Sequence, residues 1–189
     1  MIYYVSCDGG WDGNGTKEFP FKRIQDAANV AQPGDQVLVA PGIYREYVNP
    51  RQGGTPEQTI RYQAQVMGKS VITGAEPVKN WKPYREQVWV ARIPNGIFGS
   101  YNPYTTVIYG DWYYTKEAFH TGEVYLNDKA MYEASSLEAV EHPVPFEPSN
   151  DKEFSVFRWY TCQEDGNTVI YGNFHGLNPN EENVEINVR

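Results

Sequence analysis

The first part of the chain places short strand-like segments directly after a short amphipathic helix, and this order most constrains the fold. After Pro20, apolar residues recur at helical spacing and form one stripe: Phe21, Ile24, Ala27, Ala28 and Ala31. Short β-branched or apolar runs then recur about 11 residues apart, separated by turn residues, at 37–39, 43–48, 59–63 and 70–73. Such spacing is typical of a coil or a sandwich. A helix that covers the open end of a first coil favours a parallel β-helix.

From residue 76 onward the pattern changes. Aromatic residues crowd among Pro, Gly and Asn turns, namely Trp81, Trp89, Phe98, Tyr101, Tyr104, Tyr109, Trp112, Tyr113 and Tyr114. Short strand candidates follow at residues 107–109, 123–126, 154–160, 168–171 and 184–188, with a helical turn at 137–140. This all-β pattern predicts a small β-sandwich.

The charge of the chain divides at the same place. Residues 1–75 hold 7 basic and 7 acidic residues, so the whole formal net charge of -8 belongs to residues 76–189. This balance argues against nucleic acid, an anionic membrane surface or a polyuronate, because each of these ligands needs Lys and Arg. A neutral substrate fits better. No apolar stretch reaches the length of a bilayer span, and the N-terminus lacks a secretion signal, so a native start at Met1 predicts a cytoplasmic protein.

Few residues in the chain suggest a metal or a cofactor. Asp8, Asp12 and Asn14 leave open a structural calcium ion, although a solvated turn is the simpler interpretation. Cys7 and Cys162 lack metal-type spacing and are expected to be free buried thiols. The three histidines are His120, His142 and His175, and they are far apart in the sequence. No metal site and no cofactor is therefore predicted.

The N-terminal motifs resemble the entry of right-handed parallel β-helix proteins that act on carbohydrates. The motifs that carry the resemblance are Tyr4-Val5-Ser6, the Gly-rich loop after it, residues 20–27, residues 33–37 and residues 42–46. That group contains polysaccharide lyases, epimerases and glycosidases. The resemblance is specific for the fold and weak for the chemistry.

Motifs in the second half resemble the β-sandwich that is inserted into β-xylosidases of glycoside hydrolase family 120. They are Phe98-Gly99, Asn102-Pro103, Gly110-Asp111-Trp112, residues 120–127, residues 178–182 and residues 184–189. The resemblance implies cap and first coils of a parallel β-helix at 1–75, an inserted jelly-roll-like sandwich at 76–185, and a return to the β-helix at 186–189. It therefore implies an all-β fold class: a right-handed parallel β-helix with a short N-terminal capping helix, interrupted by a β-sandwich.

The same resemblance implies a function for the whole protein. Family members are retaining exo-acting xylosidases, which hydrolyse xylo-oligosaccharides with two carboxylates about 5 Å apart. In the family these carboxylates lie on later coils, beyond Arg189, so no catalytic residue is assigned to this chain and the chain alone is expected to be inactive. The implied partners are the substrate and the remaining C-terminal β-helix, and a homo-oligomer is left open.

The resemblance also nominates one contact residue in the sandwich, and the chemistry of nearby residues adds three further candidates. Trp112 resembles a Trp that reaches over the substrate pocket of the family and stacks on sugar, with sandwich core as the alternative. Asp111 can hydrogen-bond a sugar hydroxyl or serve a turn. His120 and Glu123 can lie on one side of a loop-to-strand turn, which would make Glu123 a pocket residue, with structural packing as the alternative.

Two other functions are compatible with the residues. A non-catalytic carbohydrate-binding or structural module would use the aromatic density of residues 76–114. Such a module would also leave the strands at 70–73 and 184–188 exposed with nothing stacked on them, and a β-helix of so few coils would bury too little core. A lyase or epimerase acting on a polyuronate would need basic side chains that the acidic second half does not supply.

Overall fold

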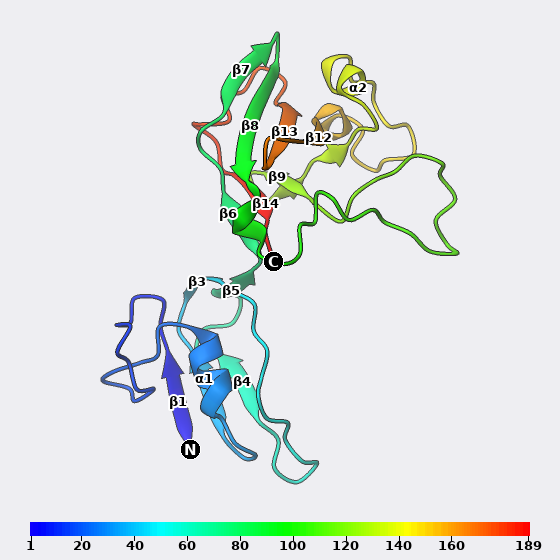
Figure 1. The fold of residues 1–189 in the computed structure, drawn as a ribbon. Helices are drawn as coiled ribbons and strands as arrows, with labels where there is room; N and C mark the ends of the chain where they lie inside the picture. Colours follow the sequence, from blue (N-terminus) through cyan, green and yellow to red (C-terminus); the bar gives the residue numbers. More distant parts are fainter. The chain divides into compact units, whose positions relative to one another are not determined.

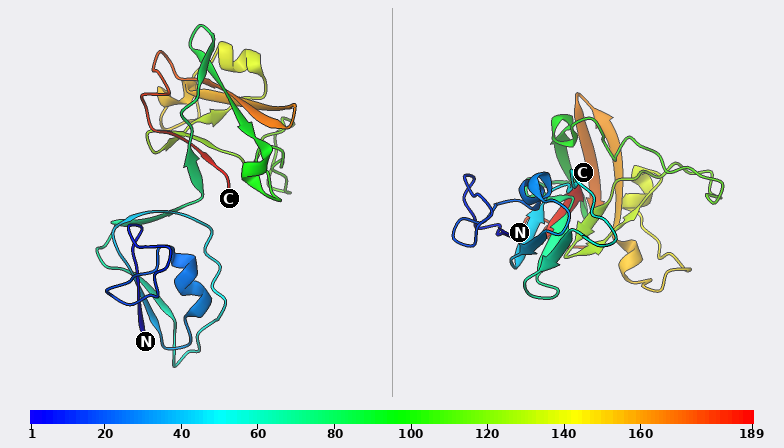
Figure 2. Two further views of the ribbon diagram at one scale, coloured as in Figure 1. Left: turned by 60° about the vertical axis from the view of Figure 1, so that its left-hand side comes forward. Right: turned by 90° about the horizontal axis from the view of Figure 1, so that it is seen from below.

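The computed structural model describes residues 1–189 and divides them into two compact units, residues 1–74 and 75–189. We call these the coil unit and the sandwich unit. Both are built of short strands with only brief helical segments, and Figures 1 and 2 show the path of the chain through each. The predicted fold class, the start of a right-handed parallel β-helix with a capping helix and a β-sandwich, is confirmed.

Two parallel sheets form the coil unit. One has the order β1-β2-β4 and the other pairs β3 with β5, where the strands are β1 (Ile2–Val5), β2 (Gln36–Val39), β3 (Gly42–Arg45), β4 (Arg61–Ala64) and β5 (Ser70–Thr73). The strands stack in register, so that Val39 lies opposite Val5 on one side and Ala64 on the other. Successive passes of the chain therefore place equivalent residues on top of one another, as in a parallel β-helix.

The short helix α1 (Ile24–Val30) covers the core of the coil unit. Its apolar stripe is buried, and Ile24 and Ala27 belong to the same cluster as Val5 and Val37. The carboxylate of Glu46 accepts hydrogen bonds from the backbone N–H groups of Ile24 and Gln25, each at 2.8 Å. A negative group at this end satisfies free N–H groups and complements the helix dipole.

The last strands of the coil unit have no neighbour on one side. β4 ends its sheet, and β5 pairs only with β3. Val71 and Ile72 of β5 are exposed there, and Tyr62 of β4 is also partly open. Unpaired edges with apolar side chains are uncommon in a finished fold because they invite further strands.

Antiparallel pairing dominates the sandwich unit. One sheet has the order β10-β9-β14-β6 and the other β11-β12-β13-β8-β7. The strands are β6 (Ala75–Pro77), β7 (Lys82–Arg85), β8 (Val88–Pro94), β9 (Val124–Leu126), β10 (Lys129–Ala130), β11 (Tyr132–Glu133), β12 (Arg158–Glu164), β13 (Asn167–Asn173) and β14 (Val184–Asn187). Two short 3-10 helices, η1 (Asn95–Phe98) and η2 (Phe154–Val156), join them.

Large aromatic side chains fill the core of the sandwich unit. Trp81 meets Phe174 edge to face at 5.0 Å between ring centroids, and Tyr104 meets Trp159 at 5.7 Å. The indole N–H of Trp159 donates to the carbonyl of Met131 at 3.3 Å, so that its one polar group is satisfied inside the core. A second cluster, which includes Val88, Val169 and Tyr171, is completed by Val140 of α2 (Leu137–Glu141).

Several predicted strands differ in detail from the structure. The segment at 154–160 is divided, because Phe154 and Phe157 stack at 4.8 Å in and after η2, and β12 begins only at Arg158. The segment at 107–109 forms an isolated bridge between Val107 and His120 and no full strand. The predicted boundary at residue 185 lies inside β14, which pairs with β6 as far as Asn187 within the sandwich unit.

The minor predictions concern cysteines and ions. Cys7 and Cys162 are both free and half-buried, and burial together with Glu164 raises the pKa of the Cys162 thiol. Asn14 Oδ1 accepts from the backbone N–H and the hydroxyl of Thr16, which is the behaviour of a turn. No group of three or more His, Cys, Asp or Glu side chains is placed to hold a metal ion. None of the helices combines the length and hydropathy of a membrane span.

Candidate functional site

A loop of the sandwich unit, residues 107–120, carries most of the predicted contact residues, and we call it the Trp112 loop. The N–H of Tyr113 donates to the carbonyl of Gly110 at 3.1 Å, which closes a turn with Asp111 and Trp112 at its two central positions. The hydroxyl of Tyr113 then donates to the carbonyl of Glu117 at 3.0 Å. The loop is therefore organised locally around its aromatic tip.

Trp112 lies on the surface and not in the core. Its side chain is 63% exposed, and its ring meets only the edge of Tyr113, at 5.9 Å between centroids. A Cβ on Gly110 would lie 2.5 Å from the indole nitrogen, so a side chain at this position would displace the ring. The core interpretation of Trp112 is wrong, and a ring face remains open to a ligand.

Asp111 is exposed beside Trp112, where its backbone serves the turn and its carboxylate faces solvent. Tyr109 and Tyr114 are also almost fully exposed on the same loop. Exposed rings of this density offer flat apolar faces and hydroxyl groups in one small region. Such faces suit the C–H faces of sugar rings, and a nearby carboxylate suits their hydroxyls.

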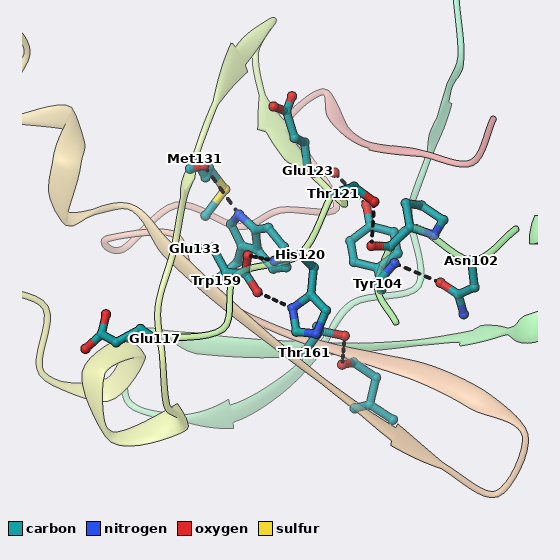
Figure 3. A network of polar contacts seen from close by, with 12 residues as sticks. Asn102, Tyr104, Glu117, His120, Thr121, Glu123, Met131, Glu133, Trp159 and Thr161 are labelled. Atoms are coloured by element: carbon teal, nitrogen blue, oxygen red, sulfur yellow. Dashed lines mark hydrogen bonds and ion pairs between the residues drawn. The ribbon is translucent and has the colours of Figure 1, made fainter. Parts of the chain in front are cut away.

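His120 ends the loop in contact with a carboxylate that comes from another element. Oε2 of Glu133, in β11, accepts from the backbone N–H of His120 at 2.7 Å, and Oε1 lies 2.5 Å from its Nδ1 (Figure 3). Glu133 has only 9% of its side chain exposed. The structure therefore pairs His120 with Glu133, and not with Glu123.

Glu123 lies in a different arrangement at the start of β9. Its exposed carboxylate accepts a hydrogen bond from the hydroxyl of Tyr125, and its N–H donates to Asn187 Oδ1 at 2.7 Å. Burial, followed by the hydrogen bond to Glu123, raises the pKa of Tyr125 to about 12. Tyr125 is therefore a donor at neutral pH, and Glu123 keeps its carboxylate at the surface.

Tyr104 anchors the chain before the loop. Its hydroxyl donates to the carbonyl of Glu123 at 2.6 Å (Figure 3) and lies 3.0 Å from Asn187 Oδ1. Burial raises its pKa well above the usual value for tyrosine. The loop therefore begins next to a part of the core whose position is fixed.

A cleft of about 660 Å³ lies beside the Trp112 loop, and we call it the loop cleft. Its lining includes Phe119 from the loop, with Tyr132, Phe146 and the carboxylate of Glu133. Arg158 also lines it, with its guanidinium 5.3 Å from the centre of the Tyr132 ring and a hydrogen bond to the carbonyl of Val144 at 3.2 Å. Burial lowers the pKa of Arg158. Volume and lining are in the range of sites for small ligands.

The structure thus brings some predicted residues together and separates others. Asp111 and Trp112 share one turn, His120 joins Glu133, and Glu123 belongs to the β9–β14 contact. Sequence analysis missed Glu133, and it could not have found it from periodicity, because 13 residues separate Glu133 from His120 across a loop and two strands. The arrangement offers ring faces, hydrogen-bond donors and carboxylates for binding.

Comparisons with known proteins agree with this picture. Residues 78–186 match the family described as "Glycoside hydrolase 120, insertion domain". The solved structure described as "The complex structure of XylC with xylose" is 38% identical, with a TM-score of 0.92, over 100% of this chain and 32% of that one. The uncharacterized protein YwoF of Bacillus subtilis (strain 168) is 31% identical over 77 residues, which are 41% of this chain and 16% of YwoF. The chain spans about a third of XylC and less of YwoF.

Proposed function

The chain belongs to glycoside hydrolase family 120, and from this premise we propose that it is the N-terminal part of a retaining exo-β-xylosidase. The whole protein would remove xylose from short xylo-oligosaccharides. The observation that carries the proposal is the match along the entire chain, at 38% identity and a TM-score of 0.92, to XylC in complex with xylose.

The catalytic step belongs to coils that follow this chain. Retaining hydrolysis uses one carboxylate as nucleophile and a second as acid and base, about 5 Å apart. The nucleophile forms a glycosyl-enzyme intermediate, and the second carboxyl protonates the leaving oxygen and then deprotonates water. We place both groups beyond Arg189 and assign neither to this chain.

The coil unit would provide the base on which those later coils stack. The unpaired edges of β4 and β5 and the exposed Ile72, which lies opposite the buried Tyr44, support this role, because the next pass of a β-helix would pair with the strands and cover this side chain. The C-terminal β-helix is therefore the first partner of this chain.

The Trp112 loop would provide one wall of the substrate site. The open face of Trp112 would stack on a xylose ring, and the Asp111 carboxylate would accept from a sugar hydroxyl. The acidic balance of residues 76–189 also fits a neutral substrate, because anionic sugars would be repelled.

Hydrolysis of an aryl β-xyloside tests the proposal. The protein that carries this chain together with its downstream coils should release xylose with retention of configuration, which nuclear magnetic resonance of the first product would show. The 189 residues alone should be inactive. Activity of the isolated chain, or inversion by the whole protein, would contradict the assignment.

A further inference from the structure

Few backbone contacts join the two ends of the Trp112 loop, residues 106–108 and 119–121, which we call the neck of the loop. The N–H of Ile108 donates to the carbonyl of Phe119 at 2.8 Å, and the N–H of Thr121 donates to Thr106 at 2.9 Å. Together with the isolated bridge between Val107 and His120, these contacts make a very short two-stranded ribbon. Ribbons of this kind are marginal by themselves, so a further contact is needed to fix the loop.

Glu133 supplies a contact from a fixed part of the fold. It lies in β11, where it pairs with Trp159 of β12, and Ala134 donates its N–H to the carbonyl of Trp159 at 2.7 Å. Trp159 is only 1% exposed, so the backbone around Glu133 is tied to the main core. The carboxylate therefore starts from a rigid position.

Both oxygens of this carboxylate are used on one residue of the loop. Oε2 receives the backbone N–H of His120 and Oε1 faces its Nδ1, at 2.7 and 2.5 Å (Figure 3). The low dielectric around a largely buried carboxylate strengthens the hydrogen bonds that it accepts. The backbone bond fixes the position of His120, and the ring bond fixes its orientation.

We propose that Glu133 is a positioning residue that holds the Trp112 loop in place through its two hydrogen bonds to His120. The inference rests on the proposed function, in which Trp112 stacks on the sugar. Other polar contacts act beside the neck: the Tyr101 hydroxyl lies 2.6 Å from Thr121 Oγ1, and Thr121 Oγ1 donates to the carbonyl of Pro103 at 3.2 Å. Glu133 acts on the last residue of the loop itself. Without the Glu133 carboxylate, the Trp112 ring would occupy many positions. Substrate binding would then weaken, while the chemical step would stay intact.

Hydrogen exchange followed by mass spectrometry measures the neck directly. In the protein that carries the full chain, Glu133→Ala should speed exchange in residues 107–121 by about tenfold or more, the loss expected when two largely buried hydrogen bonds are removed. Exchange in β12 and β13 should stay unchanged. Glu133→Gln keeps an acceptor for the backbone N–H of His120, and its amide N–H can donate to Nδ1 in the His120 tautomer that carries its proton on Nε2, so it should restore most of the protection. Glu153→Ala, which removes an exposed carboxylate of the same unit, is the matched control.

Kinetics on xylobiose give the second measurement. Glu133→Ala should raise KM by about tenfold and change kcat by less than about twofold, because only substrate placement is lost. Glu133→Gln should return KM close to the wild-type value. His120→Ala keeps the backbone bond and should give an intermediate effect, so it tests the proposal even where Glu133→Ala does not fold.

Unchanged exchange in residues 107–121 in both Glu133→Ala and His120→Ala would overturn the proposal. Equal acceleration across β12 and β13 would also overturn it, because Glu133 would then support only the sandwich as a whole. A wild-type protein that is inactive on xylosides would count against the proposed function alone, since exchange reports on the loop without any substrate.

Discussion

The two units of this chain bury their apolar surface in different ways. The coil unit stacks parallel strands in register, and each layer covers the one before it. Its last layer is left open, with Ile72 56% exposed. The sandwich unit pairs its strands mainly antiparallel, and two sheets enclose a core of large aromatic side chains.

The difference separates two tasks. A stack of coils is extended by adding layers, so the coil unit is suited to continue into further chain. A closed sandwich has no such need, and its long loops can carry contact residues on a fixed frame. In this chain the candidate binding residues Trp112, Asp111 and His120 all lie on a sandwich loop.

Removal of Trp159 should give the largest effect and should fall on one unit. The ring is buried among Tyr104 and the core carbonyls, so Trp159→Ala should cost about 3–5 kcal/mol of unfolding free energy. Chemical denaturation monitored by hydrogen exchange should show the loss of unfolding free energy in residues 75–189. Residues 1–74 should stay protected as in the wild type. An equal loss in both units would show that their cores are not independent.

Removal of the carboxylate that caps α1 should give a smaller effect in the other unit. Glu46→Ala leaves two N–H groups of α1 without partners and should lower stability by about 1 kcal/mol. Glu46→Gln keeps one acceptor and should lose less. Thermal unfolding of the variants, together with hydrogen exchange at residues 24–39, would measure this loss of stability. A loss that appears in the sandwich unit would contradict it.

Acid should weaken the coil unit through Asp35, with a smaller shift. Its hydrogen bond to the N-terminal amino group of Met1, at 2.5 Å, and the N–H of Gln32 lower the pKa of this carboxyl. A lowered pKa in the folded state stabilises above the unfolded value of about 3.9, and the contribution is lost as pH falls through the folded pKa. The melting temperature of the coil unit should therefore decrease when the pH is lowered below about 4. Asp35→Asn should be less stable at neutral pH and should lack this acid dependence, and a variant that keeps it would exclude Asp35 as its source.

The sequence predicted elements that depend on local patterns. The stripe Ile24, Ala27 and Ala28 is the buried face of α1, and the segments at 168–171 and 184–188 became β13 and β14. Composition could not show how deeply Trp112 and Trp159 are buried, because only packing makes one 63% and the other 1% exposed. The pairing of His120 with Glu133 depends on how a loop returns to β11, which no periodicity encodes.

The role of the Trp112 loop is tested most directly by Trp112→Ala in the protein with its downstream coils. Because the ring is exposed and supports no core, the melting temperature should stay within about 1 °C of wild type. The value of kcat/KM for xylobiose should fall by about tenfold or more, equal to about 1.4 kcal/mol of lost transition-state binding. Trp159→Ala serves as the opposite control, with a large loss of stability. Wild-type kinetics in Trp112→Ala, with or without a lower melting temperature, would contradict the proposed role of the loop.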